Sequence, residues 1–209
     1  MDRVISQLDM LVPYLSLAHE RVFELVESEY DNWCPTPRRT PMPDTFDAFK
    51  TQIAHAAFVL GFSYADAFLA DLIKEIYYKH PEMLPQKKKL SFETIINARS
   101  YDEVLRKMVN HEVHEAMHNG IEKIAEYFKE KFGISWPETE KQEFITASLI
   151  RNCIIHNNAC ANDKLSEKGN WSTGQRISLA VSDVHKYGIA ARRILRHVYQ
   201  EAASRHLER

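Results

Sequence analysis

Apolar residues recur at every third or fourth position along most of the chain, which is the spacing of one face of an α-helix. This spacing and the low glycine content, six in 209 residues, predict an all-α fold of long antiparallel helices. The stretch "RISLAV", residues 176–181, is a candidate for one short strand. We expect helices over 2–30, 46–78, 101–132 and 139–156, and a last one from 182 to near the end.

The first helix is separated from the others by "CPTPRRTPMPD", residues 34–44, which contains four prolines. This proline density predicts an extended connection, because proline breaks helices and restricts the residue before it. The segment before the connection is too short to form a core of its own. We therefore expect one domain over 1–209, in which 1–45 is a helix plus a loop and 46–205 is the core.

Composition narrows the class of protein. The net charge is −2, so no overall basic field marks a nucleic-acid binder, and any such contact needs a local patch. Three cysteines without a CxxC pair fit a reducing compartment better than a disulfide-bonded secreted domain. The amphipathic N-terminus is unlike a signal peptide, and no run of about 18 apolar residues exists. We expect a cytoplasmic protein without membrane contact.

The stretch "RNCIIHNN", residues 151–158, ends the helix expected over 139–156. A rotation of about 100° per residue places Asn152 and His156 on one side of this helix. The opposite side is apolar and consists of Phe144, Ala147, Ile150, Ile154 and Ile155. The helix end therefore combines a packing face with a polar face that carries an amide and an imidazole.

Arg151 lies on the apolar side of the same helix, where an unpaired charge is costly. Its guanidinium must reach solvent or find an acid, and Asp66 is the candidate partner, whereas ordinary surface charge accounts better for Asp71. Two interpretations stay open: a buried ion pair with His156 stabilising the helix end through its dipole, or joint action on a phosphate. The spacing does not decide, because Arg-x4-His occurs at Arg106 and His111, Arg151 and His156, and Arg192 and His197.

The residues "RNCIIHNNA" resemble the signature of the HEPN superfamily, in which an arginine, a polar residue that is commonly asparagine, and a histidine follow in short order. The preceding "VLRKMVNHEVHEAMHNGIEKIAEYFKEKFGI" is similar to the RiboL-PSP-type branch, where a helix and a "KFGI"-like turn come before the motif helix. The similarity covers about residues 50–200. Ala159 stands where the family commonly has glycine.

The resemblance implies a HEPN-like helical bundle that forms homodimers and cuts RNA without a metal or any other cofactor. It implies Arg151, Asn152 and His156 as catalytic residues, with Asp66 and Asn157 in supporting roles. It also implies an effector of toxin–antitoxin or anti-phage defence, with an antitoxin or defence protein as a partner. The alternative that it leaves open is a non-catalytic HEPN-like dimer that binds nucleotides or acts as a scaffold.

A second motif, "HEAMH", is a literal H-E-x-x-H pattern. On a helix it places His114 and His118 one turn apart with Glu115 beside them, as in zinc hydrolases. The longer form of that motif fails, because residue 121 is isoleucine rather than glycine. A solvated face with His–Glu neighbours explains the same residues. We therefore expect no metal site, and a zinc hydrolase is the third functional alternative.

Overall fold

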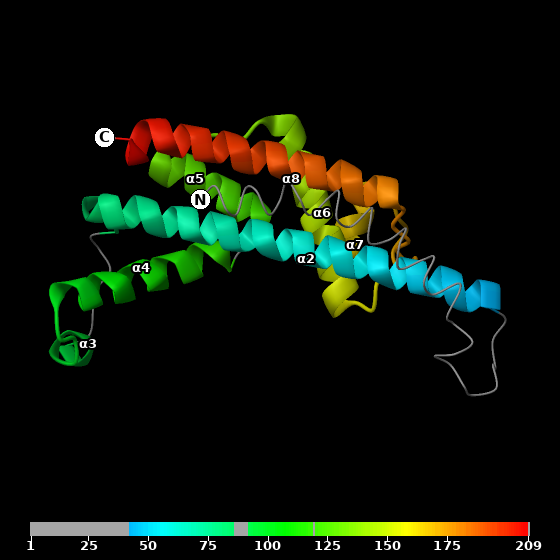
Figure 1. Ribbon diagram of the computed structural model, residues 1–209, viewed down its shortest axis with the longest axis horizontal. Coiled ribbons are helices and arrows are strands. Elements are labelled where there is room, and N and C mark those ends of the chain that lie inside the picture. The colour runs from blue at the N-terminus through cyan, green and yellow to red at the C-terminus, as the bar shows by residue number, and fades with distance from the viewer. Residues whose placement is uncertain (1–41, 86–91, 119, 209) are drawn as a thin grey trace. The chain divides into compact units, whose positions relative to one another are not determined.

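A computed structural model describes residues 42–85, 92–118 and 120–208 of the chain. These residues fold into helices and loops (Figure 1), and no strand occurs among them, so the predicted all-α class is confirmed. In chain order the elements are α2 (Met42–Lys79), the 3-10 turn η1 (Pro81–Met83), α3 (Phe92–Ile96), α4 (Tyr101–Met117), α5 (Ile121–Phe132), α6 (Glu138–His156), α7 (Asp163–Ser166), α8 (Val181–Ala202) and the π-helical turn η2 (Ala203–Leu207).

The predicted element boundaries agree with the structure to different degrees. The helix expected over 2–30 and most of the proline-rich connection lie outside the described residues. α2 begins at Met42, earlier than the predicted start at 46. The candidate strand at 176–181 is reduced to a single β-bridge between Cys160 and Arg176, because only one residue on each side pairs.

The single helix predicted over 101–132 is in fact two helices, so this prediction was wrong. α4 ends at Met117 and α5 begins at Ile121, and Gly120 between them has φ 79° and ψ 165°. That backbone conformation is accessible essentially to glycine alone, so the chain turns here although its apolar spacing continues. α4 and α5 then lie side by side as an antiparallel helical hairpin (Figure 1).

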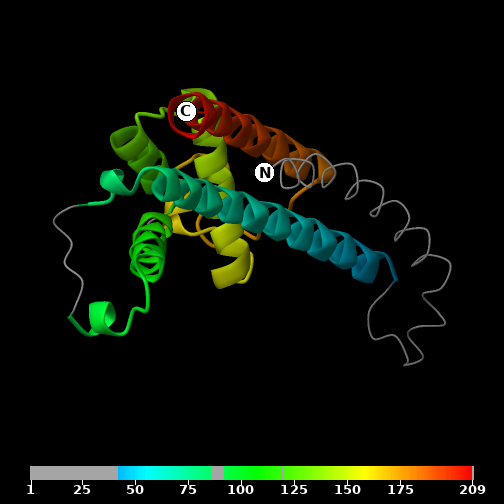
Figure 2. The same ribbon diagram turned by 60° about the vertical axis from the view of Figure 1, so that its left-hand side comes forward.

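The short helix α3 is an element that the apolar spacing does not predict. Its five residues are too few to establish a helical period. Figure 2 shows it standing clear of the longer α4, and its Phe92 and Ile96 side chains are 84% and 78% exposed. α3 therefore contributes little to the core.

The described residues divide into two compact units, and the long helices α2, α6 and α8 each contribute to both. The first unit combines 42–64 with 146–192. The rings of Phe58 on α2 and Tyr187 on α8 meet edge to face within it, with centroids 5.9 Å apart. Other buried side chains of this unit come from α6 and from the segment between α6 and α8, and include Ile150, Leu165 and Ile177.

The second unit combines 65–145 with 193–208 and has an aromatic core that includes Phe128 and Phe132, whose ring centroids are 5.5 Å apart. His80 Nε2, just after α2, lies 2.9 Å from the carbonyl oxygen of His206 in η2. His206 Nε2 lies 3.0 Å from the carbonyl oxygen of Phe132 at the end of α5. The carboxyl-terminal ends of α2, α5 and α8 with η2 thus meet here. α2 and α8 therefore end on the same side of this unit, unlike the antiparallel arrangement that was predicted for the long helices.

One stretch of α2, Thr51–Lys79, is long and apolar enough to cross a membrane by length and composition alone, with a mean hydropathy of 1.6. Core helices of other folds pass the same test, and α2 supplies buried side chains such as Phe58 to the first unit and Leu72 to the second. The cytoplasmic location and the absence of membrane contact remain predictions.

Substituting Gly120 by alanine tests the break between α4 and α5. We predict that Gly120→Ala lowers the free energy of unfolding by about 1 to 3 kcal/mol, because a β-carbon strains this backbone conformation although nothing lies within 4 Å of it. Glu122→Ala, at an exposed position on α5, should change it by less than about 0.5 kcal/mol. Urea unfolding followed by circular dichroism measures both variants. Equal stability of Gly120→Ala and the parent chain would show that this turn does not need glycine.

Candidate functional site

The motif helix α6 buries one face through residues spaced three apart. Ala147, Ile150 and Cys153 are fully buried and hold the second half of α6 in the first unit. Ile155, which was predicted on the apolar side, is instead 43% exposed. It lies about 140° around the helix from Ile150, the centre of the buried row, so its side chain turns away from the core.

Arg151, Asn152 and His156 occupy the carboxyl-terminal part of α6. Arg151 and Asn152 are half-buried, and His156 is exposed. The Arg151 Nη1 atom donates a hydrogen bond to the Asn152 Oδ1 atom at 3.2 Å, so the guanidinium orients the amide. His156 is the basic residue of the last turn, where a positive charge interacts favourably with the helix dipole. The end of α6 thus brings together a guanidinium, an amide and a solvent-facing imidazole.

Asp66, the predicted acid partner of Arg151, is half-buried on α2 within the second unit. Arg151 belongs to the first unit, and the pairing of these two residues remains a prediction. Asp71, interpreted from the sequence as ordinary surface charge, forms an ion pair with Lys74 at 2.8 Å on the same helix. This local pair accounts for Asp71 without a role in the motif.

The turn after α6 is closed by two hydrogen bonds to one carbonyl group. The Cys153 carbonyl accepts from the backbone N–H groups of Asn157 and Ala159, each at 3.0 Å. Such a helix end requires left-handed backbone, and Asn158 and Ala159 have φ values of 50° and 57°. Asn157, predicted as a supporting residue, donates from its side-chain Nδ2 to the Cys160 carbonyl at 2.7 Å. This bond ties the turn to the residue that follows it.

Residues 174–177, which we name the strap, form hydrogen bonds with the backbone of this turn and of the residue just beyond it. The Ala161 N–H donates to the Gln175 carbonyl at 2.8 Å. The Ile177 N–H donates to the Ala159 carbonyl at 2.7 Å. The turn is therefore held by backbone hydrogen bonds to both α6 and the strap.

His55 on α2 lies against the strap in the same unit. Its side chain is 4% exposed and forms a hydrogen bond with the backbone of Ile177. Its Nε2 atom is buried without a hydrogen-bond partner among the described residues. Burial lowers the pKa of His55, the bond to Ile177 opposes this shift, and the nearby Arg176 guanidinium adds to it. The direction is downward overall, so the folded chain favours a neutral His55.

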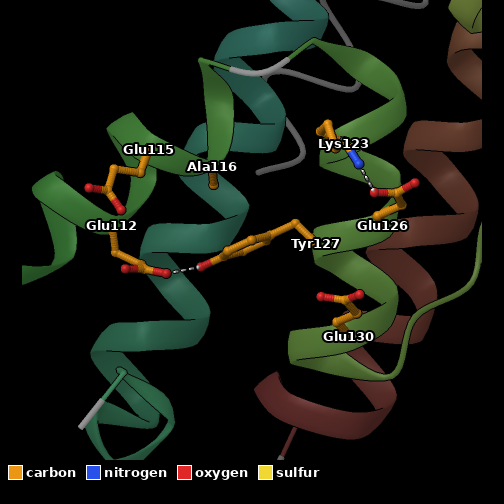
Figure 3. Close-up of a pocket in the computed structure, with 7 residues that line it drawn as sticks. All are labelled: Glu112, Glu115, Ala116, Lys123, Glu126, Tyr127 and Glu130. Carbon is orange, nitrogen blue, oxygen red and sulfur yellow. Dashed lines mark hydrogen bonds and ion pairs between the residues drawn. The ribbon is translucent and has the colours of Figure 1, made fainter. Parts of the chain in front are cut away.

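A concave site lies between α4 and α5 in the second unit. Glu112 there is 4% exposed, and its Oε1 atom accepts a 3.0 Å hydrogen bond from the Tyr127 hydroxyl, which also bonds the Tyr77 hydroxyl. Burial, followed by the contacts with Tyr77 and Glu112, raises the pKa of Tyr127 well above its ordinary value. The acidic lining disfavours a phosphate. The hollow has a volume of about 410 Å³ and is lined by Glu112, Glu115, Ala116, Lys123, Glu126, Tyr127 and Glu130 (Figure 3).

The sequence interpretation missed Glu112 as a buried acid. It belongs to the buried row of α4 with Val109, Val113 and Ala116, so its place in the apolar spacing was the available signal. A carboxylate in such a position requires a hydrogen-bond donor. Tyr127 supplies that donor from α5, and its approach depends on the unpredicted turn between the two helices.

The "HEAMH" residues lie at the carboxyl end of α4 in the second unit. His114 and His118 are exposed, and their ring centroids are 4.6 Å apart. His111 Nε2 lies 3.7 Å from the Glu115 Oε1 atom. Within the described residues, no group of three or more histidine, cysteine, aspartate or glutamate side chains is arranged to hold a metal ion. The zinc-hydrolase interpretation therefore finds no third ligand in this part of the chain.

No family model, curated protein or solved structure matches the chain. The likeness to the HEPN superfamily therefore rests on residues 104–134 and 151–159 of the sequence. The proposed function rests on the chemistry of the side chains at the end of α6.

The buried His55 makes the stability of the fold depend on pH. The folded chain has a pKa for His55 below the ordinary 6.5 that the unfolded chain keeps. As the pH falls through 6.5, His55 of the unfolded chain binds a proton that His55 of the folded chain does not bind. The free energy of unfolding should then fall by up to about 1.4 kcal/mol per pH unit.

Urea unfolding between about pH 5 and pH 7.5 measures this dependence. His55→Asn, which retains a hydrogen-bonding group, should flatten it, whereas His111→Asn, at an exposed position, should leave it unchanged. The same pH dependence in His55→Asn and the parent chain would contradict the assignment to His55.

Proposed function

We propose that the chain is a homodimeric ribonuclease that cuts RNA without a metal ion, through Arg151, Asn152 and His156. The observation that carries the proposal is a half-buried guanidinium bonded to an amide at the same helix end as an exposed imidazole. The backbone bonds to Cys153 fix the following turn, which gives these groups a rigid support. The resemblance to the HEPN superfamily supports the same three residues.

Each residue type suits one part of the reaction. The 2′-hydroxyl of RNA attacks the adjacent phosphorus, so one proton leaves that hydroxyl and another reaches the departing 5′-oxygen. An imidazole gains or loses a proton near neutral pH, and His156 therefore serves in one of these transfers. Arg151 offers a fork of N–H donors to the negative charge that develops on the phosphate oxygens. Asn152 holds a phosphate oxygen or orients His156.

The proposal requires a homodimer, because the motif supplies one histidine per chain. A proton donor and a proton acceptor are both needed, and two motif helices facing one cleft provide two copies of His156. His156 is exposed, and Ile155 beside it presents apolar surface that a second chain can cover. From the resemblance, we propose a cytoplasmic role in toxin–antitoxin or anti-phage defence, with an antitoxin or defence protein as a partner.

The alternative is a non-catalytic HEPN-like dimer that binds nucleotides or acts as a scaffold. Two observations are compatible with it: His156 lies in the last turn of α6, where a protonated imidazole interacts favourably with the helix dipole, and the bond from Arg151 to Asn152 needs no substrate. Both functions use Arg151 for binding, but only the ribonuclease needs a proton transfer by His156. A variant of His156 therefore separates the two.

We predict that His156→Ala lowers the rate of RNA cleavage by about 10² to 10⁴ and leaves the fold intact, because it removes a proton-transfer group from an exposed position. His185→Ala, which removes an exposed histidine from α8, should keep the parent rate. Cleavage of synthetic RNA in EDTA measures the rates, and circular dichroism checks folding. In cells, overexpression of the parent chain should slow growth, and His156→Ala should not.

Arg151→Ala is a less informative variant than His156→Ala. Arg151 is half-buried, and removal of one partner of a buried ion pair can cost about 3 to 5 kcal/mol, so lost activity would be confounded by unfolding. Equal cleavage by the parent chain and His156→Ala would remove the proposed mechanism. Absence of cleavage by the parent chain with every RNA and partner tested would favour the scaffold.

The two-histidine mechanism also predicts assembly. The purified chain should sediment at twice its mass of 24.3 kDa. Ile155→Asp should shift the chain toward the monomer and lower cleavage, because it places a charge beside the motif. Ile96→Asp, on the exposed α3, is the matched control and should leave the dimer unchanged. A parent chain that stays monomeric at high concentration would exclude a site built from two copies of His156.

A further inference from the structure

The "HEAMH" residues form a feature that the proposed ribonuclease does not use. His114 lies in the last turn of α4, His118 is the residue that caps this helix, and both are exposed. The backbone of His118, with φ −78° and ψ −13°, continues the helical geometry. The two Cβ atoms therefore keep the spacing of a pair four residues apart, about 5 to 6 Å. Two imidazoles stand next to each other on one solvent-facing side of the helix end.

The separation of these two rings is within the range that is compatible with a shared metal ion. Histidine nitrogens bind Zn²⁺ at about 2.0 to 2.1 Å, and a ring centre lies roughly 1.2 Å behind its ligating nitrogen. Two rings bound to one ion at angles between about 90° and 109° therefore have centres roughly 4.5 to 5.2 Å apart. The centroids of His114 and His118 are 4.6 Å apart, and their planes are tilted by 41°. Rotation of exposed side chains brings one nitrogen of each ring to a common point.

We propose that His114 and His118 together bind one divalent transition-metal ion of the class that imidazole prefers, such as Zn²⁺, Ni²⁺ or Cu²⁺. Two protein ligands leave the other coordination positions to water. Mg²⁺ and Ca²⁺ do not fit, because these ions take oxygen ligands. Glu115 is not part of this coordination: it lies beside His111 and lines the hollow between α4 and α5 (Figure 3).

The α4–α5 hairpin also carries an acidic hollow, which is separate from the histidine pair. Four glutamates and one lysine line the hollow between α4 and α5. That lysine, Lys123, is already paired with Glu126 at 2.7 Å. Helical spacing places Glu112 and Ala116 about 120° to 160° around α4 from His114 and His118, so the hollow and the histidine pair occupy different faces of this helix.

The metal site is independent of the proposed ribonuclease. It lies in the second unit, whereas His156 lies in the first. It also differs from a zinc hydrolase, because catalytic zinc normally has three protein ligands and no such group of three occurs among the described residues. An ion held by His114 and His118 bridges the last turn of α4 and stabilises the folded chain by binding to it.

Isothermal titration of the full-length chain without a tag, with Zn²⁺ as the probe, tests the proposal. We expect one ion per chain and an affinity lower by about tenfold or more in His114→Ala and in His118→Ala, because each variant turns a two-point attachment into a single one. His111→Ala, which changes the neighbour of Glu115, should bind as the parent chain does. Mg²⁺ should give no binding heat. Saturating Zn²⁺ should raise the Tm of the parent chain and not of the double variant.

Folding of the variants is checked by circular dichroism and is expected to be unchanged, since both histidines are exposed. The proposal is overturned if the parent chain binds Zn²⁺ no more tightly than the double variant His114→Ala, His118→Ala. A loss of affinity in His111→Ala as large as that in His114→Ala would also overturn it, because the ion would then be held by a different set of ligands.

Discussion

The carbonyl group of Cys153 accepts two backbone N–H groups, and the arrangement of the candidate site depends on that pair of hydrogen bonds. The last carbonyls of a helix have no donors within the helix, and here Asn157 and Ala159 supply them to one carbonyl. The closure forces a left-handed backbone at Asn158 and Ala159, which costs about 1 to 2 kcal/mol for a residue other than glycine. Asparagine tolerates this conformation well, and the bond from Ile177 to the Ala159 carbonyl offsets the cost at alanine.

The turn is hydrogen-bonded to both Cys153 and the strap, and α6 therefore has a defined end at His156. The strap bonds the turn, and His55 on α2 bonds the strap, so three segments of the first unit form one hydrogen-bonded series. Each link holds the next in place. The proposed proton transfer needs its groups placed to within about 0.5 Å, which requires a rigid support of this kind. The neutral, buried His55 makes the same support sensitive to acid.

The parts of the fold that could be predicted are those with local signals. The proline-containing turn and the capping residues before α6 predicted a start at 139, one residue from the observed Glu138, and apolar spacing continues along the helix. Apolar spacing ran through Gly120 without detecting the break, since the conformation of one glycine leaves no mark on the spacing of apolar residues. The exposure of Ile155 and the bond between Glu112 and Tyr127 depend on which helices pack together, and a single-chain pattern does not contain that information. The partner of Arg151 likewise depends on which helices pack together.

The chemical ends of RNA fragments test most directly whether the end of α6 cleaves RNA by attack of the 2′-hydroxyl. Fragments produced by the purified chain in EDTA should carry 2′,3′-cyclic phosphate and 5′-hydroxyl ends in mass spectrometry, because the neighbouring hydroxyl displaces the 5′-oxygen. RNA with 2′-O-methyl groups should stay intact, since it lacks that nucleophile. Fragments with 5′-phosphate and 3′-hydroxyl ends, or cleavage of the methylated RNA, would contradict a mechanism built on Arg151, Asn152 and His156.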